Sequence, residues 1–204
     1  MAVVGVLGGS GGVGASSLAA ALATAAGHSV LIDCDPAGGG IDVLLGIEAV
    51  PGARWSGLRV DGGRLDPAAL DNGLPRWGSV SVLAADVAPA PAAVTQVVGA
   101  AASVGAVVLD LPRAAGALRD AAVACCSLCV LLAIADVRPL AAARTVRPAG
   151  SAVGVVVRRG SVAPVEAARM LGAPLLGVLP GPPRSSMPRS LARIAAGVLD
   201  GLAA

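Results

Sequence analysis

A glycine-rich segment near the start of the chain restricts the possible folds more than any other feature of the sequence. The apolar run of residues 2–7 passes into GGSGGVGASS (residues 8–17), and an alanine-rich stretch of helical length follows. Glycines at this spacing let the backbone turn sharply between a buried strand and a helix, with successive N–H groups facing inward. The segment therefore predicts a strand–loop–helix unit in which an anion can meet the positive end of the helix.

The rest of the chain repeats this alternation of apolar and alanine-rich segments. Apolar, valine-rich runs occupy 2–7, 29–33, 79–84, 104–110, 127–134, 152–157 and 174–179, and stretches of helical length occupy 15–26, 92–102, 114–124, 137–146, 162–171 and 188–203. Continuous apolar runs suit strands covered on both faces, and their alternation with helices indicates βαβ units. We expect an α/β fold, with a doubly wound, mostly parallel sheet flanked by helices in three layers. Residues 48–78 are less regular, and Asp66 with Pro67 predicts a helix start there.

The glycine segment fits two motifs at once. From Gly9 to Ser16 it follows the phosphate-binding pattern G-x-x-x-x-G-K-[ST], except that Ala15 stands in the place of the lysine. Gly9, Gly11 and Gly14 also fit the dinucleotide pattern G-x-G-x-x-G, with Asp33 as the acidic residue further on. A tight turn without any ligand is the third interpretation, because five glycines in residues 8–14 alone do not prove binding.

Carboxylates at the ends of two strands favour the first motif. Asp33 and Asp35 follow the second apolar run, and Asp110 ends a later one. Acids two residues apart on a strand point the same way, so both can approach a metal ion or a water beside a phosphate. A dehydrogenase has no need of Asp110, whereas a Mg²⁺-dependent nucleotide site does.

The glycine loop, LIDCDP (31–36), VVLDLPR (107–113) and APLLGVLPG (173–181) together resemble the MinD/ParA family of deviant-Walker P-loop ATPases. Within that family the chain looks most like the CpaE/TadZ branch, which includes actinobacterial septum-site and pilus-assembly homologues. The resemblance covers most of the chain and implies a single P-loop NTPase-like domain over residues 1–204. Proteins of this branch commonly carry an N-terminal receiver-like domain, and we expect none here.

The resemblance also implies a set of site residues. Ser16, Asp35 and Asp110 match the Mg²⁺ site, and Asp35 matches the catalytic carboxylate that positions the attacking water. The residues expected to bind ATP or ADP are Gly9, Ser10, Gly11, Gly12, Val13, Gly14, Ala15, Ser16, Ser17, Asp33, Arg113 and Arg158. The two phosphate-binding lysines of the family fall at Ser10 and Ala15, and the chain contains no lysine at all. Arg113 and Arg158 are the candidates to replace their charge, and we expect ATP hydrolysis to be slow or absent.

Three functions follow from these patterns. The first is a nucleotide-binding homodimer that acts as a positioning scaffold for pilus, secretion or septum machinery, as the resemblance implies. The second is a nucleotide-independent interaction module with a dead loop. The third, a Rossmann NAD(P)-binding protein, is disfavoured because the chain has neither tyrosine nor lysine.

The composition of the chain limits the kinds of binding partner and the cellular compartment that we expect. A net charge of +2 gives no strong indication of nucleic-acid binding. The longest uncharged apolar stretch, 121–135, is shorter than the ~20 residues that a membrane helix needs. Four cysteines do not form the disulfide framework of a secreted domain, so we expect a cytoplasmic protein, with polar or septal placement through its partners. The stretch 188–203 is expected to pack on the domain, while peripheral membrane contact stays open.

Overall fold

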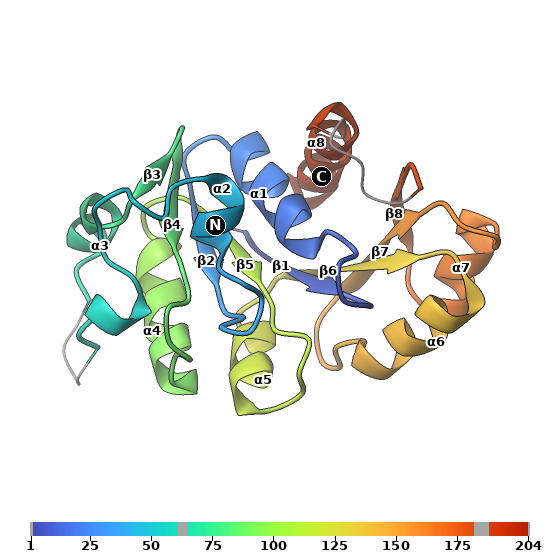
Figure 1. Cartoon of the computed structure of the whole chain (residues 1–204), viewed down its shortest axis with the longest axis horizontal. Helices are drawn as coiled ribbons and strands as arrows, with labels where there is room; N and C mark the ends of the chain where they lie inside the picture. Colours follow the sequence, from blue (N-terminus) through green and yellow to red (C-terminus); the bar gives the residue numbers. More distant parts are fainter. Residues whose placement is uncertain (1, 61–64, 182–187, 204) are drawn as a thin grey trace.

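One sheet runs through the part of the chain that the computed structural model describes, residues 2–60, 65–181 and 188–203. Its eight strands lie in the order β3-β4-β2-β5-β1-β6-β7-β8 (Figure 1), and all pairs are parallel except β3 with β4. The strands are β1 (Val3–Gly8), β2 (Ser29–Asp33), β3 (Arg76–Trp77), β4 (Val80–Leu83), β5 (Ala106–Asp110), β6 (Leu128–Ile134), β7 (Val153–Arg158) and β8 (Leu175–Leu179). The predicted doubly wound, mostly parallel sheet is confirmed.

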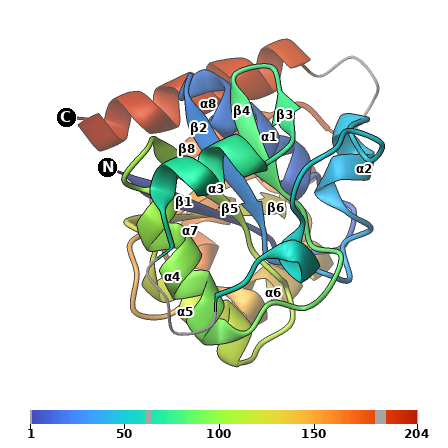
Figure 2. The same ribbon diagram turned by 90° about the vertical axis from the view of Figure 1, so that its left-hand side faces the viewer.

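Helices cover both faces of the sheet and create two apolar layers. The helices are α1 (Ala15–Ala25), α2 (Ile41–Leu45), α3 (Pro67–Gly73), α4 (Pro91–Ala101), α5 (Ala117–Ala124), α6 (Val137–Val146), α7 (Pro164–Leu171) and α8 (Pro188–Ala203), with a 3-10 turn at Trp55–Gly57. Buried residues of α1, α2 and α8 form one layer, and those of α3 to α7 form the other. Figure 2 shows α8 along one side of the sheet and α4 and α5 along the opposite side. Every residue of β1 and β7 is buried, as expected for strands covered on both faces.

The position of β5 excludes the dinucleotide-binding topology. In a Rossmann sheet the first two strands are neighbours, but here β5 lies between β1 and β2 and pairs with both. The arrangement places the end of β5, Asp110, between the end of β1 and the end of β2. The third function considered from the sequence therefore loses its structural basis.

The irregular region 48–78 contains three short elements beside the sheet edge. The predicted helix start at Asp66 is confirmed, because its carboxylate accepts a hydrogen bond from the N–H of Ala68 at 3.2 Å. From α3, Asp71 accepts a hydrogen bond from the buried Ser81 hydroxyl of β4 at 2.5 Å and one from Arg76 at 2.9 Å. These contacts tie α3 and β3 to the edge of the sheet.

The helix α8 packs against α1 rather than standing apart. Leu191, Ile194, Ala195 and Val198 are buried in the same apolar layer as α1, which confirms the expectation that this helix packs on the domain. No helix among the described residues has both the length and the apolarity to cross a membrane.

Candidate functional site

The carboxyl ends of β1, β2 and β5 open into one cavity of about 770 Å³. Ligand sites in proteins usually have a volume of roughly 300–1,000 Å³. The cavity is lined by the glycine loop and by the segments that follow β2 and β5: Gly8, Ser10, Gly11, Gly12, Val13, Gly14, Ala15, Ser16, Ser17, Asp33, Asp35, Ala37, Gly38, Gly40, Ile41, Leu44, Asp110, Leu111, Arg113 and Ala114. Figure 1 shows these three strands side by side in the middle of the sheet.

The glycine loop has a backbone that only glycine adopts easily. Gly12 and Gly14 have φ values of +69° and +95°, in the left-handed region. Gly14 is the N-cap of α1, so the positive end of this helix faces the cavity. Val13 is buried in the apolar layer beneath and anchors the loop. Apart from the adjacent residues, no atom of the described part of the chain lies within 4 Å of where a Cβ would stand on Gly11 or Gly12, so this side of the loop is open to a ligand.

Most of the predicted site residues lie around this cavity, and two do not. Ser10 to Ser17, Asp33, Asp35, Asp110 and Arg113 line it. Gly9 instead faces α6, where a Cβ would lie 2.6 Å from that of Ala143. Arg158 lies behind the loop and contacts its backbone.

Strand register explains why Asp33 and Asp110 meet. The two residues pair directly between β2 and β5, so their side chains leave the same face of the sheet. Leu31 and Val108, two residues earlier on the same strands, are buried in the layer that contains α1. Both carboxyl groups therefore lie on the α1 side of the sheet, where the Ser16 hydroxyl approaches Asp110 as a hydrogen-bond donor.

Both carboxyl groups are nearly inaccessible to water. Asp110 is 5% exposed and Asp33 is 2% exposed. Burial raises the pKa of Asp110 to about 7, although the Ser16 hydroxyl acts in the opposite direction, and the charge of Asp33 adds to the rise. No ion pair joins either aspartate to a basic side chain in the described part of the chain. A bound cation would remove the energetic cost of burying these charges.

Asp33 also organises the segment that follows β2. Its carboxylate accepts hydrogen bonds from the N–H groups of Asp35 at 2.9 Å, Ile41 at 3.1 Å and Ala85 at 3.4 Å. Burial raises the pKa of Asp33 to about 6, while these bonds partly offset the rise. On the other side, the indole N–H of Trp55 donates to the Asp33 carbonyl at 2.7 Å. Asp33 is thus a structural support of the cavity wall.

Asp35 is the most accessible of the three aspartates. It is half-buried, and one of its carboxylate oxygens accepts a hydrogen bond from the N–H of Ala37 at 3.2 Å. Asp35 also lines the cavity. A side chain in this position is suited to orient a water molecule, as the resemblance implies.

The cavity lining is acidic overall. It contains three aspartates and, among the described residues, one basic side chain, the exposed Arg113. Ser10 and Ala15, at the two lysine positions, also line it without adding charge. No group of three or more histidine, cysteine or acidic side chains in the described residues is placed to hold a metal by itself. A Mg²⁺ site built from one or two protein oxygens, phosphate oxygens and water has no need of such a group.

One wall of the cavity was not anticipated from the sequence. Ala37, Gly38, Gly40, Ile41 and Leu44 line it, from the turn after β2 into α2. The run of three glycines at 38–40 was the available indication, because Gly39 and Gly40 have positive φ values of +88° and +85°. Packing of Trp55 under region 48–78 was expected from the sequence, but its hydrogen bond to the Asp33 carbonyl was not.

Comparison with known sequences finds a longer relative. No protein-family model matches the chain. An uncharacterized protein of Mycobacterium tuberculosis, found in two strains, is 42% identical over 198 residues, which cover 90% of this chain and 55% of the relative. The chain therefore spans about half the length of the curated relatives it matches.

Solved structures with the same fold include ATPases of the ParA and MinD type. A ParA family ATPase from Chlorobium tepidum superposes with a TM-score of 0.76 and 16% identity, covering 100% of this chain and 94% of that one. The septum site-determining protein MinD from Pyrococcus horikoshii, complexed with Mg-ADP, superposes with a TM-score of 0.71 and 18% identity, covering 100% and 98%. This similarity shows that the chain has the fold of ParA and MinD ATPases.

Proposed function

We propose that this protein binds ATP or ADP together with Mg²⁺ in the cavity at the glycine loop, and that it hydrolyses ATP slowly or not at all. The observation that carries the proposal is the convergence of the loop, the Ser16 hydroxyl and the buried Asp110 carboxyl on one cavity. The backbone of the glycine loop and the start of α1 suit the phosphates. The similar MinD structure from Pyrococcus horikoshii is a complex with Mg-ADP, which is consistent with this ligand.

The residues of this chain fit a magnesium ion. Mg²⁺ prefers hard oxygen ligands and keeps much of its water shell. Ser16 and Asp110 would hold it, with Asp35 within the same cavity, and the ion would neutralise phosphate charge. Because three carboxylates line the cavity, we expect nucleotide binding to depend strongly on the divalent cation.

We expect slow hydrolysis because this chain has Ser10 and Ala15 at the two positions where the family has lysine. Ser10 and Ala15 cannot place a cation at the transferred phosphate, where phosphoryl transfer needs one. By analogy with the loss of single oxyanion donors, each absence lowers the rate by roughly 10²–10³-fold. Rapid Mg²⁺-dependent release of phosphate by the purified protein would contradict this part of the proposal.

The finer assignment rests on the resemblance to the CpaE/TadZ branch. We propose a homodimeric scaffold that positions pilus, secretion or septum machinery from the cytoplasm, at a pole or septum through its partners. Light scattering with and without Mg-ATP tests the dimer, since a monomer under both conditions would contradict it. The interpretation of residues 1–204 as a single P-loop NTPase-like domain belongs to the same proposal.

Calorimetric titration with ATP, ADP and NAD, with and without Mg²⁺, tests nucleotide binding. Gly14→Val is the disruptive variant, because its Cβ would stand 2.8 Å from Nη2 of Arg158 beneath the loop and its backbone is held at φ +95°. Gly27→Val is the matched control, because Gly27 has a similar φ of +75° with open space around it and does not line the cavity. We expect the wild type and the Gly27 variant to bind Mg-ATP and the Gly14 variant not to. A wild type that binds no nucleotide would instead support the interaction module with a dead loop.

A further inference from the structure

Arg158 is an unusual residue for its position at the end of β7. Its side chain is 1% exposed, and arginine is almost never buried so completely unless its donors are satisfied. It does not line the cavity. Its charge therefore sits behind the loop, on the side away from a ligand.

Among the described residues, the guanidinium donates hydrogen bonds to two backbone segments. The Nε–H group donates to the Val13 carbonyl at 2.6 Å, and Nη1 donates to the Gly181 carbonyl at 3.3 Å. The Nη2 atom lies 2.8 Å from where a Cβ would stand on Gly14. Arg158 thus packs directly beneath the Val13–Gly14 peptide and links the loop to the segment after β8.

The hydrogen bond from Arg158 to the Val13 carbonyl also determines the direction of the Gly14 N–H group. In a trans peptide the C=O group and the following N–H group point in opposite directions. Because Arg158 holds the Val13 carbonyl on the buried side, the Gly14 N–H is turned toward the opposite side, where Gly14 lines the cavity. Polarisation of the carbonyl by a cation also strengthens the peptide as a donor.

We propose that Arg158 is a positioning residue for the nucleotide phosphates, which orients the Val13–Gly14 peptide and supplies from behind the loop part of the positive charge missing at Ser10 and Ala15. This inference rests on the proposed nucleotide binding and specifies how the same site recognises a diphosphate or triphosphate. It predicts that Arg158 contributes more to the affinity for a nucleotide when more phosphates of that nucleotide contact the loop. It also explains why position 14 must be glycine, since any side chain there would displace the guanidinium.

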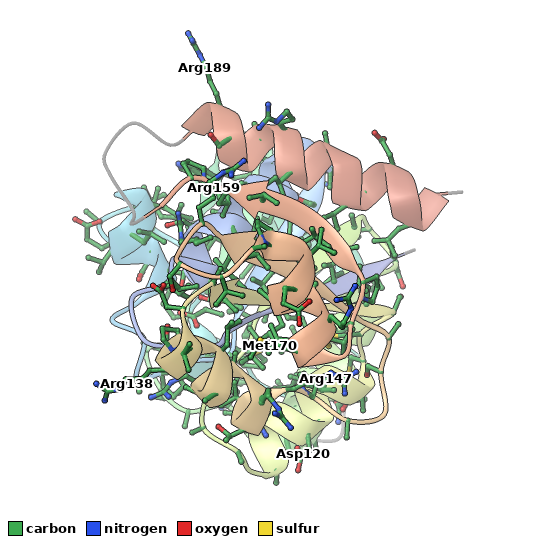
Figure 3. All side chains as sticks on the ribbon, turned by 90° about the vertical axis from the view of Figure 1, so that its right-hand side faces the viewer. Asp120, Arg138, Arg147, Arg159, Met170 and Arg189 are labelled. Atoms are coloured by element: carbon green, nitrogen blue, oxygen red, sulfur yellow. The ribbon has the colours of Figure 1, made fainter. Side chains whose placement is uncertain are left out.

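The test compares Arg158→Met, Arg158→Lys and the control Arg159→Met. Methionine keeps most of the length of arginine and removes the charge, while lysine keeps the charge but cannot make both hydrogen bonds in the same geometry. Arg159 is the adjacent arginine, and Figure 3 shows it at the surface near α8. Affinities for Mg-ATP, Mg-ADP and AMP are measured by displacement of a fluorescent ATP analogue, and folding by circular dichroism.

We expect Arg158→Met to weaken binding of Mg-ATP and Mg-ADP by about tenfold or more, the usual scale for a hydrogen bond to a charged group, while AMP changes by less than threefold. We expect Arg158→Lys to recover part of the loss and Arg159→Met to match the wild type. An equal loss for all three nucleotides, which a merely structural role would cause, overturns the inference. If Arg158→Met does not fold, Arg158→Lys carries the comparison, and unchanged selectivity between ATP and AMP in that variant overturns the inference as well.

The two proposals fail in different ways. A wild-type protein that binds no nucleotide refutes the proposed function, and the role of Arg158 with it. A wild type that binds Mg-ATP, together with an Arg158→Met variant of equal affinity, refutes the role of Arg158 alone.

Discussion

Asp110→Asn should stabilise the protein without ligand at neutral and alkaline pH. Burial raises the pKa of Asp110 from an ordinary 3.8 to about 7 in the folded state. Between these two values the folded chain binds a proton that the unfolded chain has released, so stability falls as the pH rises through this window. Above pH 7 the full penalty of ionising Asp110 is present, and asparagine removes it.

The magnitude follows from the size of the shift. One pKa unit corresponds to about 1.4 kcal/mol, so a rise of about three units sets an upper limit of about 4 kcal/mol on the gain at pH 8. The difference in unfolding free energy between variant and wild type should shrink by about 1.4 kcal/mol per pH unit below pH 7 and vanish near pH 4. Asparagine keeps the shape of the side chain and an acceptor for Ser16, so no cavity offsets the gain.

Urea unfolding followed by tryptophan fluorescence measures this difference. Wild type and variant are compared from pH 5 to pH 8 in the presence of EDTA, so that no divalent cation occupies the site. The pH dependence shared by both proteins cancels in the comparison. A variant no more stable than the wild type at pH 8, or a difference that stays constant down to pH 5, would refute the reasoning. Mg-ATP should then stabilise the wild type and not the variant.

Two further substitutions test residues that stabilise the structure around the cavity. Trp55→Phe removes the indole donor from the buried carbonyl of Asp33. We expect the free energy of unfolding to fall by about 1–3 kcal/mol, measured as a lower Tm by calorimetry. An unchanged Tm would show that the hydrogen bond contributes nothing. Asp71→Ala leaves the fully buried Ser81 hydroxyl without its acceptor and removes the ion pair with Arg76. We expect a similar loss of unfolding free energy, measured by urea unfolding. An Arg76→Met variant with the same loss would assign the effect to the ion pair instead of the buried hydroxyl.

The long elements were predictable because each satisfies a strong local pattern. Buried parallel strands read as continuous apolar runs, and the strands found near 29–33 and 127–134 lie where those runs predict them. The two-residue strand β3 was not predictable, because its pairing with β4 depends on how α3 docks through Asp71. The five-residue helix α2 was missed because it is too short for a helical period to be recognised.

The site was predictable where its residues end strands and not where it depends on side-chain direction. Asp33 and Asp110 follow apolar runs, so their convergence at one edge could be expected. The face of β7 that Arg158 occupies could not be read from the sequence, because β7 is a continuous apolar run that is buried on both faces. Val156, two residues earlier, faces the layer of α1 and α8, so Arg158 is turned to the same side, beneath the loop. The wall at 37–44 had no comparable pattern.

The place of β1 in the sheet has a consequence for how the chain folds during synthesis. Its neighbours are β5 and β6, which lie about a hundred residues or more further along the chain. Pairing across such a separation is slow, because a long loop must close before any contact compensates for the lost entropy. Until the ribosome has made β5 and β6, β1 has neither partner, and its valines remain a potential target for chaperones. The glycine loop acquires its final shape only when both partners have been made, so the proposed nucleotide binding would report on completion of the central sheet.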